Sequence, residues 1–214
     1  VLGTDESSSG DVARRAGNEM LFQMQALMNI ELFESLEVTR ILTCDPHAYN
    51  TFKNEYPDLG GSYEVIHHTR FLKEQMDNGS LKIPAGALEG RTITYHDPCY
   101  LGRANREYTA PRQIIDALAA KQVEMPRNKS FALCCGAGGG QMFKEAEEGK
   151  KEVFIERTEE ALDTGADIIA TACPYCTRML NEAVRALGVG DRIVVRSRSV
   201  RARSTAACSR ADAA

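Results

Sequence analysis

Five cysteines in the second half of the chain have the residue type and spacing of a binding site for a soft metal. Cys134 and Cys135 are adjacent, and four glycines follow them within five residues. Adjacent Cα atoms lie only about 3.8 Å apart, whereas an unstrained disulfide needs roughly 5.5–6 Å, so the doublet is a poor disulfide. Cys99 lies upstream, and Cys173 with Cys176 forms a Cys-x-x-Cys pair. Such pairs commonly chelate zinc or iron–sulfur clusters.

Several chemistries are open to these cysteines. Zinc takes four ligands, so a zinc site would leave one of the five thiols unused, and buried free cysteines would need no metal at all. Pro174 inside the Cys-x-x-Cys pair also suits a redox dithiol of thioredoxin type, but a dithiol explains neither the doublet nor the glycines. We favour an iron–sulfur cluster, because it can use all five thiolates.

The rest of the sequence predicts an α/β protein whose strands position these loops. β-rich segments predict strands over 39–43, 63–67, 91–95 and 167–170, with a brief strand at 131–133. Helices are expected over 11–37, 48–56, 69–78, 111–120, 141–164 and 177–187. In the first of these, apolar residues recur at three- and four-residue spacing: Met20, Leu21, Met24, Leu27, Met28 and Leu32. We expect Met24, Met28 and Phe33 of this helix to lie in the core.

Most of the cysteine-bearing loops follow a predicted strand. The carboxyl ends of parallel strands meet at one edge of a sheet, where ligands bind. We therefore expect small parallel sheets with the cysteine loops gathered at the carboxyl ends of their strands.

The order of motifs also suggests two related α/β units. Ser8-Ser9-Gly10 and Asp45-Pro46 flank a predicted helix and strand, as Cys134-Cys135-Gly136 and Cys173-Pro174 do. We expect a first unit over 1–90 and a second over 91–188. The segment 189–214 carries six Arg, no Lys and two Asp, and we expect it to be a disordered or non-native tail.

Composition limits the class of protein. The chain has 214 residues, 43% hydrophobic and 26% charged, as soluble globular proteins do. It contains no run of eighteen apolar residues and no secretory signal, so we expect no membrane span and a reducing, cytoplasmic location. The net charge of the chain is −4. Residues 189–214 contribute +4, which leaves −8 for residues 1–188. That charge argues against a nucleic-acid surface.

The motifs together resemble the cysteine-rich CCG domain. This domain occurs in the catalytic subunit of heterodisulfide reductase and in iron–sulfur subunits of anaerobic glycerol-3-phosphate, lactate and glycolate oxidation. The resemblance covers roughly residues 3–188. It rests on the segments 96–103 (HDPCYLGR), 110–112 (APR), 134–140 (CCGAGGG), 164–167 (TGAD), 10–15 (GDVARR) and 54–57 (NEYP).

The resemblance implies a [4Fe–4S]-type cluster, non-cubane in the heterodisulfide enzymes, held by Cys99, Cys134, Cys135, Cys173 and Cys176. Glycine runs mark backbone that needs positive φ or a close approach, and the resemblance implies that Gly136, Gly138 and Gly139 turn N–H groups toward the sulfurs. The implied function is electron transfer in a heterodisulfide-reductase-like oxidoreductase, at the cytoplasmic face of the membrane. The implied partner is ferredoxin-like, a flavoprotein or a membrane cytochrome b module. The alternative is a zinc-stapled binding module without redox activity.

The first unit departs from the family pattern. Where the family often carries a second cysteine set, this chain has Ser8, Ser9, Asp45 and Ala48, with Cys44 one position away. Serine and aspartate are harder ligands than thiolate, so we expect the first site to be empty or altered.

Several polar residues lie near the cysteine motifs. We expect a structural role for the histidines His67, His68 and His96, although an imidazole could also serve as a ligand or hydrogen-bond partner. Asp97 is expected to form a turn. Arg103 and Arg157 are candidates to steady an anionic centre.

Overall fold

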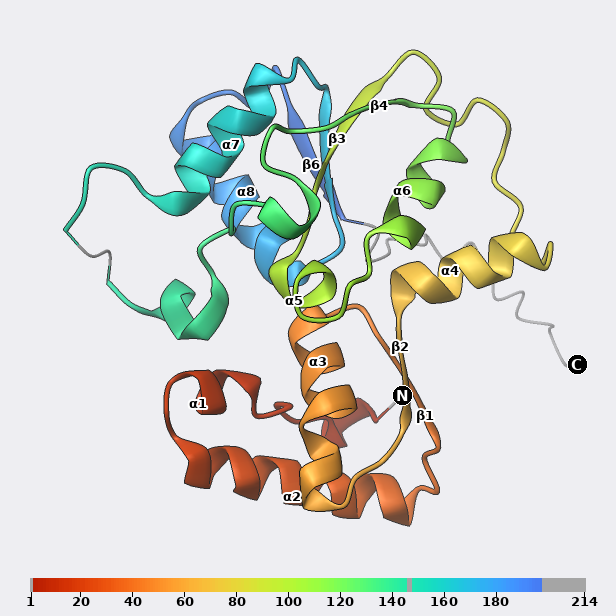
Figure 1. Cartoon of the computed structure of the whole chain (residues 1–214), viewed down its shortest axis with the longest axis vertical. Coiled ribbons are helices and arrows are strands. Elements are labelled where there is room, and N and C mark those ends of the chain that lie inside the picture. The colour runs from red at the N-terminus through yellow and green to blue at the C-terminus, as the bar shows by residue number, and fades with distance from the viewer. Residues whose placement is uncertain (1, 146–147, 198–214) are drawn as a thin grey trace, which may run out of the picture.

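The strands form two small parallel sheets (Figure 1). The computed structural model describes residues 2–145 and 148–197. One sheet pairs β1 (Arg40–Thr43) with β2 (Glu64–His67). The other has the order β4-β3-β5-β6. Its strands are β3 (Thr92–His96), β4 (Lys121–Val123), β5 (Ile168–Thr171) and β6 (Val194–Ser197). All of these pairs are parallel, which confirms the expected α/β class.

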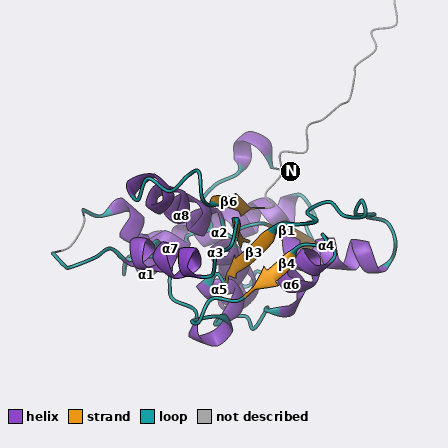
Figure 2. Ribbon diagram, turned by 90° about the horizontal axis from the view of Figure 1, so that it is seen from above, coloured by secondary structure: helices purple, strands orange, loops and turns teal. Residues whose placement is uncertain are grey.

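The helices connect the strands and cover both faces of the larger sheet. Figures 1 and 2 show α7 and α8 on one side of this sheet and α6 on the other, and Figure 1 shows α1, α2 and α3 at the end of the molecule that holds the smaller sheet. The helices are α1 (Asp11–Arg15), α2 (Glu19–Ser35), α3 (Pro46–Asn54), α4 (His68–Asp77), α5 (Cys99–Gly102), α6 (Thr109–Asp116), α7 (Val153–Asp163) and α8 (Pro174–Ala186). Short 3-10 turns are η1 (Gly3–Asp5), η2 (Tyr56–Leu59), η3 (Lys129–Phe131) and η4 (Gly138–Phe143).

The single helix expected over 11–37 is wrong, because the chain turns at Gly17. This glycine has φ 84°, and the side chain of Asn18 begins α2 by accepting a hydrogen bond from the Leu21 N–H at 3.1 Å. A left-handed residue followed by a capping side chain ends one helix and starts another.

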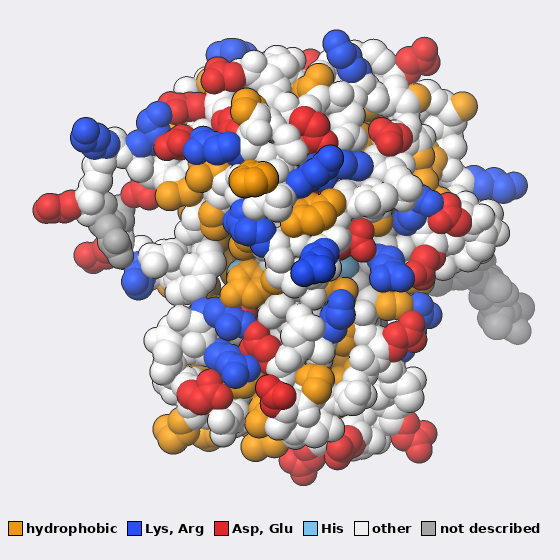
Figure 3. Space-filling model, viewed as in Figure 1, with side chains coloured by type: hydrophobic (Ala, Val, Ile, Leu, Met, Phe, Trp, Pro, Cys, Tyr) orange, Lys and Arg blue, Asp and Glu red, His pale blue; other side chains and the backbone are white. Residues whose placement is uncertain are grey.

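The core positions expected on α2 are wrong for Met24 and Met28 and confirmed for Phe33. Met24 and Met28 are 56% and 64% exposed, and the hydrophobic side chains along the lower edge of Figure 3 lie over this helix. The helix instead buries its opposite face, which packs near Tyr56 and consists of Phe22, Ala26, Asn29, Ile30 and Phe33. Both faces of the helix are apolar, so periodicity did not indicate which one packs.

Two other expectations in the second half need correction. The helix expected over 141–164 is confined to Val153–Asp163, and the start of the expected range belongs to η4, in which Gly139 and Gly140 have φ 68° and 76°. The strand expected at 131–133 is absent, and η3 lies there instead.

Part of the expected tail is ordered. Val194–Ser197 forms β6 at the edge of the larger sheet, pairing with β5, and Ile193 and Val195 are buried beside it. The expectation of disorder is therefore wrong for this strand. Residues 198–214 lie outside the described part of the chain.

Candidate metal centre

Two of the cysteine loops leave neighbouring strands at the same level. His96, the last residue of β3, pairs in register with Thr171, the last residue of β5. Cys99 begins α5 three residues after β3, and Cys173 caps α8 two residues after β5. The parallel register therefore brings these loops together, as the sequence predicted.

The cysteine doublet reaches the same place by a different route. It follows η3 and an irregular segment rather than a strand. Arg103 holds this segment, because its guanidinium donates to the carbonyl oxygens of Ala132 at 2.6 Å and Ser130 at 3.2 Å. Arg103 thus positions the backbone immediately before the doublet.

The thiols of the five cysteines form one continuous chain in which each thiol lies near enough to the next to shift its pKa. Its order is Cys99, Cys134, Cys135, Cys176 and Cys173. All five are free thiols, and the last three in this order are buried. Residues separated by more than seventy positions in the sequence therefore share one site.

Two of these sulfurs carry the negative charge most readily. Hydrogen bonds from Cys135 and Cys99 hold the pKa of Cys134 far below its usual range, while the same bonds and burial raise the pKa of both donors. Burial opposes ionisation of Cys173, but the hydrogen bond from Cys176 lowers its pKa, and the pKa of Cys176 rises in turn. Cys134 and Cys173 are therefore the thiols of the five that lose a proton most readily, and the thiolate is the form of cysteine that binds metal.

The glycine turn contacts both the sulfurs and the first unit. Gly136 has φ 83°, and its N–H donates to the Cys134 sulfur at 3.3 Å. A Cβ added to Gly138 would lie 3.7 Å from His47, and one added to Gly140 would lie 3.7 Å from Val12. Around Gly139, with φ 68°, the space is open. Gly136 therefore supports a sulfur directly, whereas a role for Gly138 and Gly139 toward a cofactor stays a prediction.

His96 lies against the thiols. One of its ring nitrogens and the sulfurs of Cys135 and Cys176 all lie within 4.8 Å of one another. Its Nδ1 accepts a hydrogen bond from the Arg157 Nε–H at 3.0 Å, and its buried Nε2 has no partner. Burial lowers the pKa of His96 to about 3, and the charge of Arg157 acts in the same direction. The imidazole is therefore neutral.

Asp97 and His67 form hydrogen bonds with neighbouring segments. Asp97 accepts two hydrogen bonds from Arg112, at 2.8 and 2.9 Å, and one from the Lys129 N–H at 2.8 Å. His67 begins α4 and bonds the Thr69 hydroxyl at 2.8 Å. Neither lies in the group of His96, Cys135 and Cys176, which is the metal-competent group among the described residues.

The altered first site contains a turn like that of the second, but Cys44 supplies its one thiol among the residues that line it. The Gly10 N–H donates to Ser8 Oγ at 3.2 Å, as Gly136 does to Cys134, and Gly10 has the same left-handed backbone, with φ 86°. Asp45 caps α3 by accepting from the His47 N–H at 2.9 Å, and Cys44 is exposed. A hollow of about 560 Å³ lies here, lined by Ser8, Ser9, Cys44, Asp45 and Ala48, among others.

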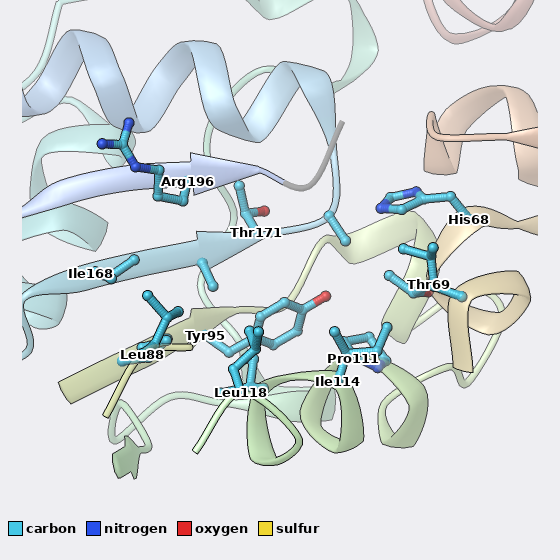
Figure 4. Close-up of a pocket in the computed structure, with 15 residues that line it drawn as sticks. His68, Thr69, Leu88, Tyr95, Pro111, Ile114, Leu118, Ile168, Thr171 and Arg196 are labelled. Atoms are coloured by element: carbon cyan, nitrogen blue, oxygen red, sulfur yellow. The ribbon is translucent and has the colours of Figure 1, made fainter. Parts of the chain in front are cut away.

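A second hollow lies on the opposite face of the larger sheet from His96. Its volume is about 260 Å³, its lining is largely apolar, and Figure 4 shows it between the strands and α6. The Tyr95 and Thr171 hydroxyls and the His68 ring lie at its lining without hydrogen-bond partners. None of the five cysteines lines it.

Comparisons with known proteins agree with this geometry. Residues 93–181 match the cysteine-rich domain family designated CCG. FadF, a probable iron–sulfur-binding oxidoreductase of Bacillus subtilis, is 48% identical over 90% of this chain and 27% of its own length. The EtfAB:quinone oxidoreductase of Syntrophomonas wolfei is 41% identical over 86% of this chain and 26% of its own. A component of the dihydromethanophenazine:CoB–CoM heterodisulfide reductase of Methanosarcina barkeri is 33% identical over 87% of this chain and 47% of its own.

The chain spans between about a quarter and about half of the length of these relatives. Among the described residues, no helix has both the length and the hydropathy needed to cross a bilayer.

Proposed function

From the membership of this chain in the CCG family of iron–sulfur oxidoreductase components, we propose that it holds one iron–sulfur cluster and passes electrons within a larger enzyme. The proposed ligands are Cys99, Cys134, Cys135, Cys173 and Cys176. The observation that carries the proposal is the continuous chain of their five free thiols.

The residues around the thiols suit such a cluster. Its sulfide ions would accept hydrogen bonds, and the buried Nε2 of His96 lacks an acceptor. The Gly136 N–H already donates to a cysteine sulfur. A zinc ion takes four ligands and would leave one of the five thiols unused. The donor set therefore favours a cluster of the [4Fe–4S] type, cubane or non-cubane, over zinc.

When bound, the cluster supplies a reversible one-electron carrier. The protein excludes water from it by burying Cys135, Cys173 and Cys176. The lowered pKa values of Cys134 and Cys173 favour the thiolate form that a cluster needs, and free thiols persist in a reducing, cytoplasmic compartment.

The names of the relatives suggest what the chain exchanges electrons with. One relative is named an EtfAB:quinone oxidoreductase, and another is named a probable membrane-anchored ferredoxin. We assign this chain the intermediate step, between a flavoprotein or ferredoxin-like donor and an acceptor at the membrane. The missing thiols of the first site leave one cluster for this task.

Metal analysis tests the proposal. Protein purified without oxygen should be brown and contain iron and acid-labile sulfide in near-equal amounts, with little zinc. The variant Cys135→Ser should lose most of the iron or change the electron paramagnetic resonance (EPR) spectrum, because it removes a sulfur from the middle of the chain of thiols. Cys44→Ser is the matched control and should keep both, since Cys44 is exposed and outside that chain. Colourless protein with stoichiometric zinc, or an unchanged spectrum in Cys135→Ser, would contradict the proposal.

A further inference from the structure

His96 and Arg157 form a buried pair directly behind two of the cysteines. His96 is 1% exposed and Arg157 is 0% exposed. The guanidinium is fixed from its far side, because its Nη1 donates to the Arg127 carbonyl oxygen at 2.7 Å and to Glu160 Oε2 at 2.9 Å. Arg157 therefore cannot turn away from the imidazole without losing both bonds.

The hydrogen bond between the two residues has one possible direction. A guanidinium carries donors and no acceptor, so its Nε–H must donate to His96 Nδ1, which lies 3.0 Å away. Nδ1 then uses its lone pair and carries no proton. The single ring proton of the neutral imidazole must be on Nε2, where the structure leaves it buried without a partner.

This hydrogen bond decides between two roles that the position of His96 would otherwise allow, namely metal ligand and hydrogen-bond donor. Its distance from Cys135 and Cys176 is compatible with a third ligand of a metal. Ligation through Nε2 would require a lone pair there and would move the proton to Nδ1. Two N–H groups would then face each other across 3.0 Å, in a site where unpaired buried donors are costly.

We propose that His96 does not ligate iron but donates its Nε2–H to a sulfur of the cluster, with Arg157 as the positioning residue that fixes this tautomer. The inference rests on the proposed function, because it assumes the cluster sulfur as acceptor. Hydrogen bonds to cluster sulfurs stabilise the reduced, more negative state and raise the reduction potential. His96 therefore sets the potential of the cluster rather than its assembly.

Redox titration of variants with bound cluster tests the effect on potential. His96→Phe should retain iron and sulfide but favour reduction roughly tenfold less, which is about 59 mV lower for one electron. His96→Gln offers an amide N–H at a similar position and should recover part of the loss. His68→Phe is the matched control, since His68 lies outside the chain of thiols, and its potential should not change. Loss of iron in both His96 variants, or unchanged potentials in both, would overturn the inference.

Pulsed EPR tests the same assignment on the unmodified protein, so the result does not depend on whether a variant folds. Protein with bound cluster and ¹⁵N-labelled histidine, held in a paramagnetic oxidation state, should show only weak nitrogen couplings. A strong coupling of the kind produced by a directly bound nitrogen would overturn the inference.

The outcome stays distinguishable from failure of the proposed function. If metal analysis finds zinc and no sulfide, the cluster proposal falls, and ¹⁵N NMR of the zinc protein then decides the role of His96. A protonated Nε2 and a bare Nδ1 would support the fixed tautomer, whereas a zinc-bound Nε2 would refute it.

Discussion

At the scale of single residues, the two units share a turn whose backbone depends on glycine. Gly10 and Gly136 have φ 86° and 83°, and each donates its N–H to the side chain two residues earlier. In one turn the acceptor is the Ser8 hydroxyl and in the other it is the Cys134 sulfur. The turn has thus kept its geometry although the chemistry of its side chains differs.

Gly10→Ala should destabilise the protein more than an ordinary left-handed glycine does. The positive φ alone costs about 1–2 kcal/mol for a residue with a Cβ, and the added Cβ would also lie 2.8 Å from Phe22 Cδ2 and 3.3 Å from its carbonyl oxygen. Urea unfolding measures the difference. Gly188→Ala is the control, because Gly188 has φ 65° but open space around it. Equal losses in the two variants would show that the contact with Phe22 is relieved.

At the scale of elements, Arg112 joins three segments around the site. It lies on α6 and bonds Asp97, which follows β3, and Glu124, which follows β4, at 2.6–3.0 Å. The charges of both carboxylates outweigh its partial burial and raise the pKa of Arg112. Asp97 lies two residues before Cys99, so this network fixes where the first cysteine loop starts. The turn-forming role expected of Asp97 is therefore extended to a buried ion pair.

Asp97→Asn should lower the free energy of unfolding by about 1.5–3 kcal/mol, because it removes the charged acceptor of the Arg112 hydrogen bonds, although Glu124 still compensates the Arg112 charge. Thermal or urea unfolding of the protein with bound cluster measures this. Glu74→Gln should change stability by less than about 0.5 kcal/mol, since its pair with Arg70 is an exposed helical one. Similar losses in both variants would argue against a special role for the Asp97 network.

At the scale of the whole molecule, the buried histidines make stability depend on pH. Burial lowers the pKa of His67 to about 3 and of His68 to about 4, and the unfolded chain binds these protons near pH 6.5. The pKa of His47 is shifted in the opposite direction. Burial opposes ionisation of its ring, but the hydrogen bond and charge of Asp11 raise its pKa. Its contribution is present below about pH 6.5 and is lost as the pH rises through the folded value.

The three histidines with a depressed pKa, which are His67, His68 and His96, outnumber His47. Stability should therefore fall as the pH drops from about 6.5 toward about 4, where the unfolded state binds more protons. Each buried neutral histidine contributes up to about 1.4 kcal/mol per pH unit in this range. Urea unfolding across the range should show a shallower pH dependence in His68→Leu than in the unmodified protein. If stability depends on pH equally in the two proteins, His68 has the same pKa in the folded and the unfolded state.

The sequence by itself determined the chemistry of the site. Five thiols in three segments indicated a soft metal whatever the fold, because ligand preference depends on the side chains present. The alternation of strands and helices also predicted the parallel register that brings the loops of Cys99 and Cys173 together, since that consequence follows from strand direction alone.

The tertiary structure decided which neighbours these residues have. Both faces of α2 are apolar, so only packing against Tyr56 settled that Phe22 is buried and Met24 exposed. Neither the short strands β4 and β6 nor the partnership of Arg157 with His96, sixty-one positions apart, leaves a local pattern in the sequence. Such contacts join segments distant along the chain, and local periodicity carries no information about them.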